Sequence, residues 1–231
     1  MNRVGVVILS RFNSSRLPGK ALLPIEGKPV LLYIYERLAK VFDPKSIIIA
    51  TSKNSSDDPI YEFSKKYKIQ CFRGSLTNVA ERFYFAGKYL NLDIALRING
   101  DNIFVDIPLL KRVKDIAEKK DYDFISNVKN RTFPKGMSIE AVKLCFYAKL
   151  LPMINKHERF KEHVTLVIYE NENEKMHFIY NIKNFELAGI QMALDTHSDF
   201  IRTHRIIKTF KGPHTQYNLE EISKILKESN E

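Results

Sequence analysis

The chain has 231 residues, of which 44% are hydrophobic, and its formal net charge is +10. This length suits one large domain or one domain with a small insertion, and the apolar content excludes a disordered chain. The surplus of 37 Lys and Arg over 27 Asp and Glu favours anionic partners. Basic and acidic residues are interspersed, as in residues 111–121, which weakens a nucleic-acid interface because that needs a clustered basic stripe.

The two cysteines, Cys71 and Cys145, are far apart and lie among apolar neighbours. No C-x-x-C spacing exists, so a cysteine-based zinc site is excluded. We expect two buried free thiols, although one disulfide remains an alternative. The first residues do not form a signal peptide, and no apolar run approaches the length of a membrane span. We therefore expect a cytoplasmic protein without a membrane or nucleic-acid partner.

In the first half, short apolar runs alternate with helical patterns. Residues 4–9 are a continuous apolar run, which is typical of a strand covered on both faces. Helices should begin at Pro29, near Asp58 and at Pro108, where proline suits a first helical turn. A fourth helix should cover residues 79–90, and the other strands are expected at 47–50, 68–73, 93–98 and 122–126. This alternation predicts a mostly parallel α/β sheet with helices on both faces and ligands at the carboxyl ends of its strands.

The second half is less regular and reads as a small α+β insertion followed by closing helices. Strands are expected at 137–142, 176–182 and 190–194, and helices at 143–154, 158–169, 197–210 and 219–228. No internal repeat or flexible linker divides the chain. We therefore expect a single domain over residues 1–231.

The loop after the first strand, residues 11–20, is the most informative segment. It carries Arg11, Arg16, Lys20, two serines and a Pro-Gly turn. Three cations on one loop repel each other unless an anion neutralises them, and backbone N–H groups in such a loop can wrap phosphate oxygens. Ala21 follows Lys20, so this is not a P-loop, and no G-x-G-x-x-G is present. The pattern indicates a triphosphate-binding loop; a solvent-exposed basic loop is the alternative.

This loop resembles the signature of the cytidylyltransferases that make CMP-activated acid sugars, and within them the SpsF-type spore-coat polysaccharide branch. The resemblance continues in order over residues 4–205. The matching positions are Arg11, Ser15, Arg16, Leu17, Pro18, Gly19 and Lys20, then 27–31, 50–52, 57–60, 72–75, Arg82, 97–101, 121–127, 162–165 and 194–196. It implies a Rossmann-like nucleotide-diphospho-sugar transferase sheet, a homodimer, and a smaller acceptor-side and dimerisation subregion at about 128–188.

Asp101 and Asp195 each follow an apolar run that should be a strand. Carboxylates at two strand ends can meet over one cleft, and magnesium prefers one or two carboxylates together with phosphate oxygens and water. The resemblance assigns both aspartates to a bound Mg²⁺ or Mn²⁺. The alternative is that each merely caps the turn or helix that follows it.

The resemblance also implies roles for other side chains. Catalytic roles fall to Lys20, Arg11 and Arg16. Nucleotide contacts fall to Ser10, Arg11, Ser15, Arg16, Lys20, Gly74, Ser75 and Arg97, and acceptor contacts to Asn127, Glu140 and His163. The acceptor side departs from the family pattern, because Gly136-Met-Ser-Ile-Glu140 stands where Gly-Leu-Asp-Val-Glu is common. The acceptor's identity is therefore open.

These expectations combine into one hypothesis and two alternatives. The chain should use CTP to convert a small acidic sugar, or a phosphorylated acceptor, into its CMP or CDP derivative with release of pyrophosphate, for surface polysaccharide or glycan biosynthesis. A metal-dependent glycosyltransferase is the first alternative, although 101–103 offers one acid where such enzymes typically use Asp-x-Asp. A non-catalytic nucleotide- or RNA-binding module is the second, and it leaves the paired aspartates unexplained.

Overall fold

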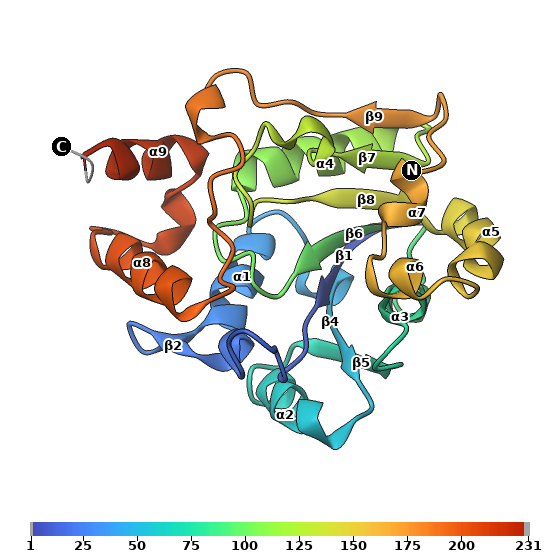
Figure 1. Cartoon of the computed structure of the whole chain (residues 1–231), viewed down its shortest axis with the longest axis horizontal. Coiled ribbons are helices and arrows are strands. Elements are labelled where there is room, and N and C mark those ends of the chain that lie inside the picture. The colour runs from blue at the N-terminus through green and yellow to red at the C-terminus, as the bar shows by residue number, and fades with distance from the viewer. Residues whose placement is uncertain (1, 229–231) are drawn as a thin grey trace.

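The computed structural model describes residues 2–228 and is built around one seven-stranded sheet (Figure 1). Across the sheet, the strands are β5 (Gln70–Gly74), β4 (Ile47–Ser52), β1 (Val4–Leu9), β6 (Ile94–Asn99), β8 (Glu140–Lys143), β7 (Phe124–Ser126) and β9 (Met176–Phe178). Among these seven, only β8 runs antiparallel to its neighbours. The predicted mostly parallel α/β sheet is confirmed. A two-stranded hairpin, β2 (Pro24–Ile25) with β3 (Lys28–Pro29), lies beside it.

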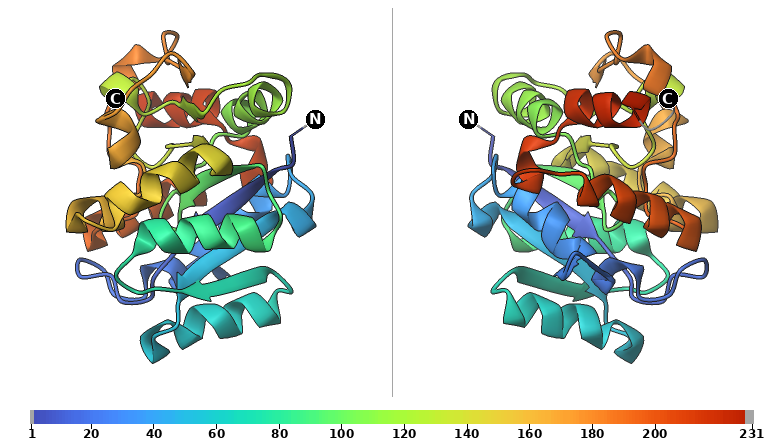
Figure 2. Two further views of the ribbon diagram at one scale, coloured as in Figure 1. Left: turned by 90° about the vertical axis from the view of Figure 1, so that its right-hand side faces the viewer. Right: turned by 90° about the vertical axis from the view of Figure 1, so that its left-hand side faces the viewer.

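Helices cover both faces of the sheet, and each face has its own core (Figure 2). One core includes apolar residues of α1 (Val30–Leu38), α2 (Asp58–Lys66), α4 (Ile107–Lys119), α8 (His197–Lys208) and α9 (Leu219–Glu228). The other includes residues of α3 (Val79–Tyr89), α5 (Leu144–Ile154), α6 (Glu158–Glu162) and α7 (Leu166–Tyr169). Short 3₁₀ turns complete the connections: η1 (Lys20–Leu22), η2 (Pro44–Ser46), η3 (Ser55–Asp57), η4 (Lys129–Arg131), η5 (Phe185–Leu187) and η6 (His214–Gln216).

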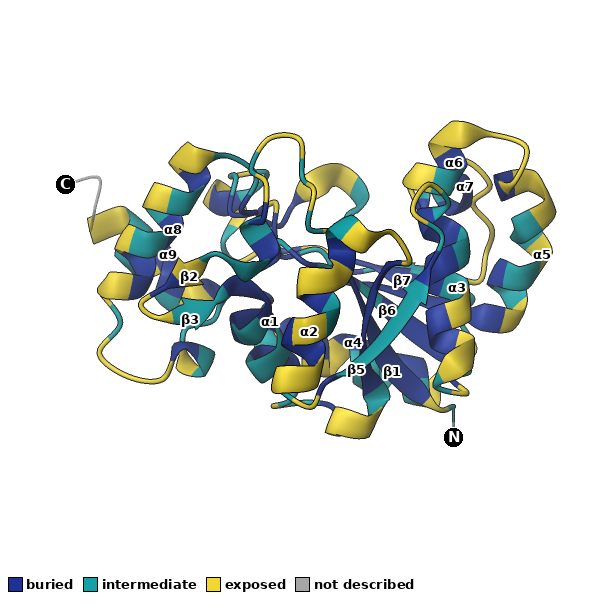
Figure 3. Cartoon of the chain, turned by 90° about the horizontal axis from the view of Figure 1, so that it is seen from below, coloured by how far each residue is buried: buried dark blue, intermediate teal, exposed yellow. Residues whose placement is uncertain are grey.

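The central strand β1 shows why the sheet needs both layers. All six of its residues are buried, with Val6 and Ile8 in one core and Val7 and Leu9 in the other (Figure 3). Successive side chains of a strand point to opposite faces, so a continuous apolar run requires cover on both. The strand predicted over residues 4–9 is confirmed with the same bounds.

Two predicted elements of the second half are wrong. The helix expected over 158–169 is two helices, α6 and α7, because His163 adopts a non-helical backbone at φ −96° and ψ 76°. The strand expected over 190–194 makes only an isolated bridge between Lys135 and Gln191. This apolar run is buried by packing at the end of the sheet, with Met192, Ala193 and Leu194 all buried, and not by a strand ladder.

The cysteine prediction is half right. Both thiols are free, but Cys71 is only partly buried and Cys145 is exposed. In the part of the chain from residue 2 to residue 228, no helix combines the length and apolar character that crossing a bilayer demands.

Candidate active site

The loop after β1, which carries Arg11, Arg16 and Lys20, is held in place by hydrogen bonds of its backbone. Asp57 accepts hydrogen bonds from the backbone nitrogens of Phe12 at 2.7 Å and Ser52 at 3.0 Å. Burial alone would raise the pKa of Asp57, but these bonds lower it below the usual range, so its carboxylate is a stable anchor. Gly19 then adopts φ 71°, which suits glycine, and starts the short helix η1 at Lys20. The loop therefore presents Lys20 from a fixed backbone turn.

The end of β6 approaches the same loop closely. The backbone nitrogen of Gly100 donates to the carbonyl of Leu9 at 2.8 Å. A Cβ atom at position 100 would lie 2.7 Å from Ser10 Oγ, so glycine is needed for this approach. The next residue, Asp101, accepts a hydrogen bond from the backbone of Leu194 at 3.1 Å. This bond brings Asp195 beside Asp101.

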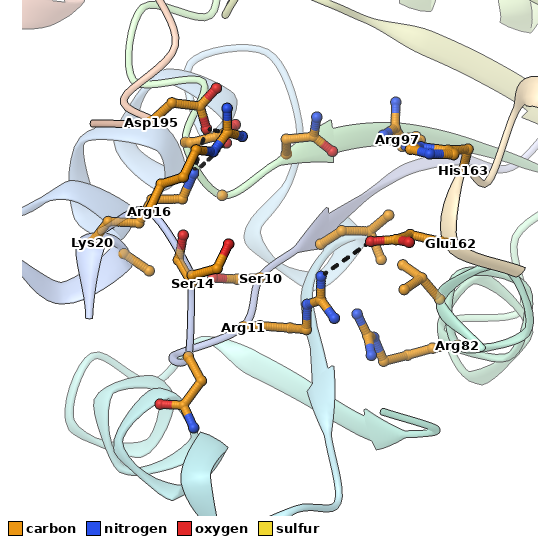
Figure 4. A pocket seen from close by; sticks show the side chains of 18 residues that line it. Ser10, Arg11, Ser14, Arg16, Lys20, Arg82, Arg97, Glu162, His163 and Asp195 are labelled. Atoms are coloured by element: carbon orange, nitrogen blue, oxygen red, sulfur yellow. Dashed lines mark hydrogen bonds and ion pairs between the residues drawn. The ribbon is translucent and has the colours of Figure 1, made fainter. Parts of the chain in front are cut away.

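Lys20 joins the two aspartates. Its Nζ atom lies 2.7 Å from Asp101 Oδ2 and 2.9 Å from Asp195 Oδ1. Arg16 approaches the same oxygen of Asp195 at 3.1 Å (Figure 4). Partial burial would raise the pKa of Asp195, but Lys20 and Arg16 lower it below its ordinary value. Asp101 and Asp195 lie side by side as expected from the sequence, but only Asp101 follows a strand, β6, whereas Asp195 follows a segment that forms no strand.

This arrangement fits a divalent cation. Two carboxylate oxygens from separate segments converge on one positively charged atom, so the ammonium of Lys20 stands where a metal ion would be held. Carboxylate oxygens are the donors that Mg²⁺ and Mn²⁺ prefer. Asp101 and Asp195 are therefore the residues that would hold the ion.

The cleft around this cluster has a volume of about 470 Å³, which is in the range of small-molecule sites. It contains most of the residues expected to contact nucleotide or metal. These are Ser10, Arg11, Ser15, Arg16, Lys20, Arg97, Asp101 and Asp195, together with His163 from the expected acceptor side. Its other lining side chains include Asn13, Ser14, Asn99, Arg82 and Glu162.

Arg82, on α3, is a cleft residue to which sequence reasoning gave no role. Its side chain is buried and donates to the carbonyl of Ser75 at 2.5 Å, while its Nε atom has no partner among the described residues. Burial and the nearby charge of Arg11 lower its pKa to about 10. Figure 4 shows Arg11 and Arg82 next to each other, with Glu162 pointing toward Arg11 at 3.8 Å. In the sequence, Arg82 lies on the same helix face as the apolar residues Val79, Phe83 and Ala86. A cation at such a position could have indicated a buried role for Arg82.

Gly74 and Ser75, which were expected to contact the nucleotide, are not among the residues that line the cleft. Gly74 is packed against the side chains of Phe72 and Arg82. Ser75 caps the turn before α3 by accepting from Asn78, and its carbonyl holds Arg82. Both residues therefore contact Arg82.

A second pocket of about 470 Å³ adjoins the cleft and shares Arg97, Asn99 and His163 with it. Glu140 lines this pocket and is almost fully buried. Its carboxylate pairs with Arg97 and accepts from Thr165 Oγ1 at 3.0 Å and Tyr169 OH at 2.7 Å. Burial and the charge of Glu140 raise the pKa of Tyr169 above its ordinary value, so the phenol stays a donor. Two of the three expected acceptor residues, Glu140 and His163, therefore share one pocket.

Asn127 is the exception. Its side chain is buried, donates to the carbonyl of Met137 at 2.9 Å and accepts from the backbone of Ile139 at 2.8 Å. It lines neither of these two pockets, so the structure does not bring it together with Glu140 and His163. Asn127 instead fixes the strand-like segment that leads into Glu140.

Comparison with known proteins agrees with this geometry. The family model described as cytidylyltransferase matches residues 5–229. The chain is 33% identical over 196 residues to an uncharacterized protein of Methanocaldococcus jannaschii, covering 84% of this chain and 79% of that one. It is 28% identical over 207 residues to the spore coat polysaccharide biosynthesis protein SpsF of Bacillus subtilis, covering 87% and 84%.

Solved structures share the fold. A cytidylyltransferase from Leptospira borgpetersenii superposes with a TM-score of 0.90 at 27% identity, covering 100% of this chain and 96% of that one. A CMP:2-keto-3-deoxy-manno-octonic acid synthetase in complex with CTP superposes with a TM-score of 0.65 at 15% identity, covering 89% and 98%. The family match extends over almost the whole chain. The chain belongs to the cytidylyltransferase family and is a nucleotidyltransferase.

Proposed function

We propose that this cytidylyltransferase transfers CMP from CTP to a hydroxyl of a small acidic sugar and releases pyrophosphate. The observation that carries the proposal is the convergence of Lys20, Asp101 and Asp195 beside a cationic loop at the end of the sheet. In this reaction the acceptor oxygen forms a bond to the α-phosphorus and loses its proton. The bond from the α-phosphorus to the bridging oxygen breaks, and pyrophosphate leaves with its electron pair.

The chain's contribution is positioning and charge stabilisation. Ser10, Arg11, Ser15, Arg16 and Lys20 line the side of the cleft where a triphosphate would be neutralised. Lys20 would stabilise the charge that develops on the α-phosphate. A Mg²⁺ or Mn²⁺ ion held by Asp101 and Asp195 would supply further positive charge next to the reacting phosphate.

The adjoining pocket is the proposed acceptor site. It opens onto the cleft through Arg97, Asn99 and His163, so an acceptor there would lie beside the triphosphate. Arg131 also lines it, and the described contact of its guanidinium is a hydrogen bond to Ser138 Oγ at 3.2 Å. A cation of this kind suits the carboxylate of an acidic sugar. The name of the synthetase bound to CTP supports this donor and acceptor class, and the name of the SpsF relative supports a role in polysaccharide biosynthesis.

We further propose a homodimer. Four large apolar side chains lie exposed on one short segment after β9: Tyr180, Ile182, Phe185 and Ile190, of which Ile182 is 86% exposed. Three of these four residues, Tyr180, Ile182 and Phe185, lie within the subregion at about 128–188 to which the family resemblance assigns the acceptor side and dimerisation. A cluster of exposed apolar residues on one segment favours contact with another protein surface, here a second copy of the chain.

A nucleotide panel tests the donor. With Mg²⁺ present, CTP should raise the melting temperature, while ATP and GTP should leave it unchanged, because binding to the folded state alone stabilises it. Pyrophosphate release should then require CTP together with a 2-keto-3-deoxy acid sugar and should not occur with a neutral hexose. A protein that ignores CTP, or that transfers the sugar from a nucleotide sugar without releasing pyrophosphate, would refute the proposal.

Lys20 provides the matched variant for the same assay. Lys20→Met should lower kcat by about 100-fold, since it removes a charge that acts on the transition state. Lys40, an exposed lysine next to the end of α1, lies outside the cleft, so Lys40→Met should keep normal turnover. Equal turnover in the two variants would contradict the role given to Lys20.

A further inference from the structure

Lys20 is the counter-ion of the aspartate pair. Its ammonium lies 2.7 Å and 2.9 Å from oxygens of Asp101 and Asp195, and the three side chains are only 14%, 18% and 19% exposed. Arg16 also reaches Asp195 but is 64% exposed, so its interaction is weakened by water. One shielded lysine therefore neutralises one of the two negative charges that would attract a metal ion.

The same oxygens cannot serve two cations at low cost. A divalent ion bound to Asp101 and Asp195 would lie within a few ångströms of the ammonium, and like charges at that separation repel strongly when partly buried. A triphosphate changes this balance because it brings several negative charges into the cleft. It offers Lys20 and Arg16 new phosphate partners, and the lysine side chain is long and flexible enough to move to them.

We propose that Lys20 is a built-in competitor for the divalent ion. While the ammonium bridges Asp101 and Asp195, the pair is closed to Mg²⁺ and Mn²⁺. When a nucleotide draws the ammonium onto phosphate, the pair is released, so the metal enters with the nucleotide and not before it. This inference rests on the proposed function of the cleft and adds the order in which it is filled.

Manganese binding in the absence of nucleotide tests the competition. Free Mn²⁺ is measured by electron paramagnetic resonance during titration of the wild-type protein, Lys20→Met and Lys20→Arg. Lys20→Met should bind Mn²⁺ about tenfold more tightly than wild type, because an unpaired partly buried carboxylate pair gains most from a new cation. Lys20→Arg keeps the positive charge and should bind as weakly as wild type.

A double variant identifies the site of the gain. Asp195→Asn in the Lys20→Met background should remove the added affinity, which ties it to the aspartate pair. Circular dichroism and thermal unfolding verify that each variant is folded. Wild type binding Mn²⁺ alone as tightly as Lys20→Met, or Lys20→Met showing no gain, would overturn the inference.

Failure of the proposed function would look different. If CTP does not stabilise the wild-type protein, the proposed CTP site is refuted, even when the manganese affinities follow the expected order. If CTP binds and wild type also binds Mn²⁺ tightly without it, the nucleotide site stands and only the competition is refuted.

Discussion

Glu140 is a buried carboxylate that its ion pair and hydrogen bonds stabilise beside a polar cleft. Its carboxylate is 1% exposed, pairs with Arg97 across β6 and β8, and accepts from two hydroxyl groups, those of Thr165 and Tyr169. A buried carboxylate needs such partners, because its desolvation costs several kcal/mol. The same contacts orient Arg97 toward both pockets.

Removing this carboxylate should therefore be costly. Glu140→Ala leaves Arg97 without its anion and should lower the free energy of unfolding by about 3 kcal/mol or more. Urea denaturation followed by circular dichroism measures the change. Glu162 serves as the matched control, since its carboxylate is 63% exposed and lies 3.8 Å from Arg11. Glu162→Ala should cost less than about 1 kcal/mol. Similar losses in the two variants would contradict the importance of burial.

Several side chains that line the cleft could be predicted from the sequence alone, because their charges are concentrated on one loop. Arg11, Arg16 and Lys20 all lie on the loop that follows a buried strand, so their charges had to meet at one edge of the sheet. Asn127 and Ser75 lie outside the two pockets, and the sequence could not show this because a polar residue in a loop looks the same whether it faces a ligand or bonds to the backbone. Only the hydrogen bonds of Asn127 to Met137 and Ile139 separate the two cases.

Among the connecting segments, residues 190–195 do most to position the side of the cleft that carries Asp195. Hydrogen bonds at 2.8 Å from Lys135 to Ile190 and from Met192 to Lys135 hold this segment beside the loop at Gly136. Gly136 has φ 94°, and a Cβ atom there would overlap the backbone of Ala193. The position of Asp195 thus depends on a glycine 59 residues earlier in the chain.

Two glycine variants test this dependence. Gly189 also has a positive φ, of 69°, but nothing lies within 4 Å of a Cβ atom placed there. Gly189→Ala should cost about 1 kcal/mol of unfolding free energy for its backbone conformation alone. Gly136→Ala adds a collision with backbone that must move, and should cost about 2 kcal/mol more. It should also reduce pyrophosphate release, whereas Gly189→Ala should not. Equal stability and activity in both would show that residues 192–195 can shift freely.

Strands and helices were predicted best where one local pattern decided them. The strand at 4–9 and the helix from Pro108 match β1 and α4 closely, because burial on two faces and a proline in the first turn leave a clear signal. The prediction of one helix over 158–169 was wrong because the apolar pattern continues through His163. At that residue the backbone leaves the helical conformation, and His163 lines the cleft. A site residue in a non-helical conformation overrides the local pattern there.

Across the whole molecule, exposed large apolar side chains are unevenly distributed. Ile182 and Phe185 are exposed on the segment after β9, while Ile201 is exposed on α8. In Figure 1, the segment after β9 runs across the top of the molecule, and α8 lies at the lower left. Isolated exposed apolar residues such as Ile201 are common, whereas a cluster favours an interface.

The quaternary proposal is tested by matched isoleucine variants. Analytical ultracentrifugation should show a dimer for the wild type. Ile182→Glu should convert it to a monomer, because a charge buried in an apolar interface lacks compensation. Ile201→Glu should remain dimeric. A monomeric wild type, or a dimer that survives Ile182→Glu, would refute the dimer through this face.

The alternation of apolar runs and helical patterns was enough to predict the parallel sheet, and the cationic loop was enough to indicate its anionic ligand. Each of these signals is local, because it is formed by neighbouring residues within one strand, one helix or one loop. The placement of Lys20 between Asp101 and Asp195, the buried guanidinium of Arg82, and the partners of Arg37 depend on contacts across the folded chain.

Arg37 is the clearest case. Its guanidinium donates at 2.6 Å to each of the carbonyls of Val105, His214 and Tyr217, two of them about 180 residues away. Burial lowers its pKa to about 10. A local pattern carries the periodicity of burial but not the identity of a distant partner, so such charges acquire their roles only when topology brings the segments together.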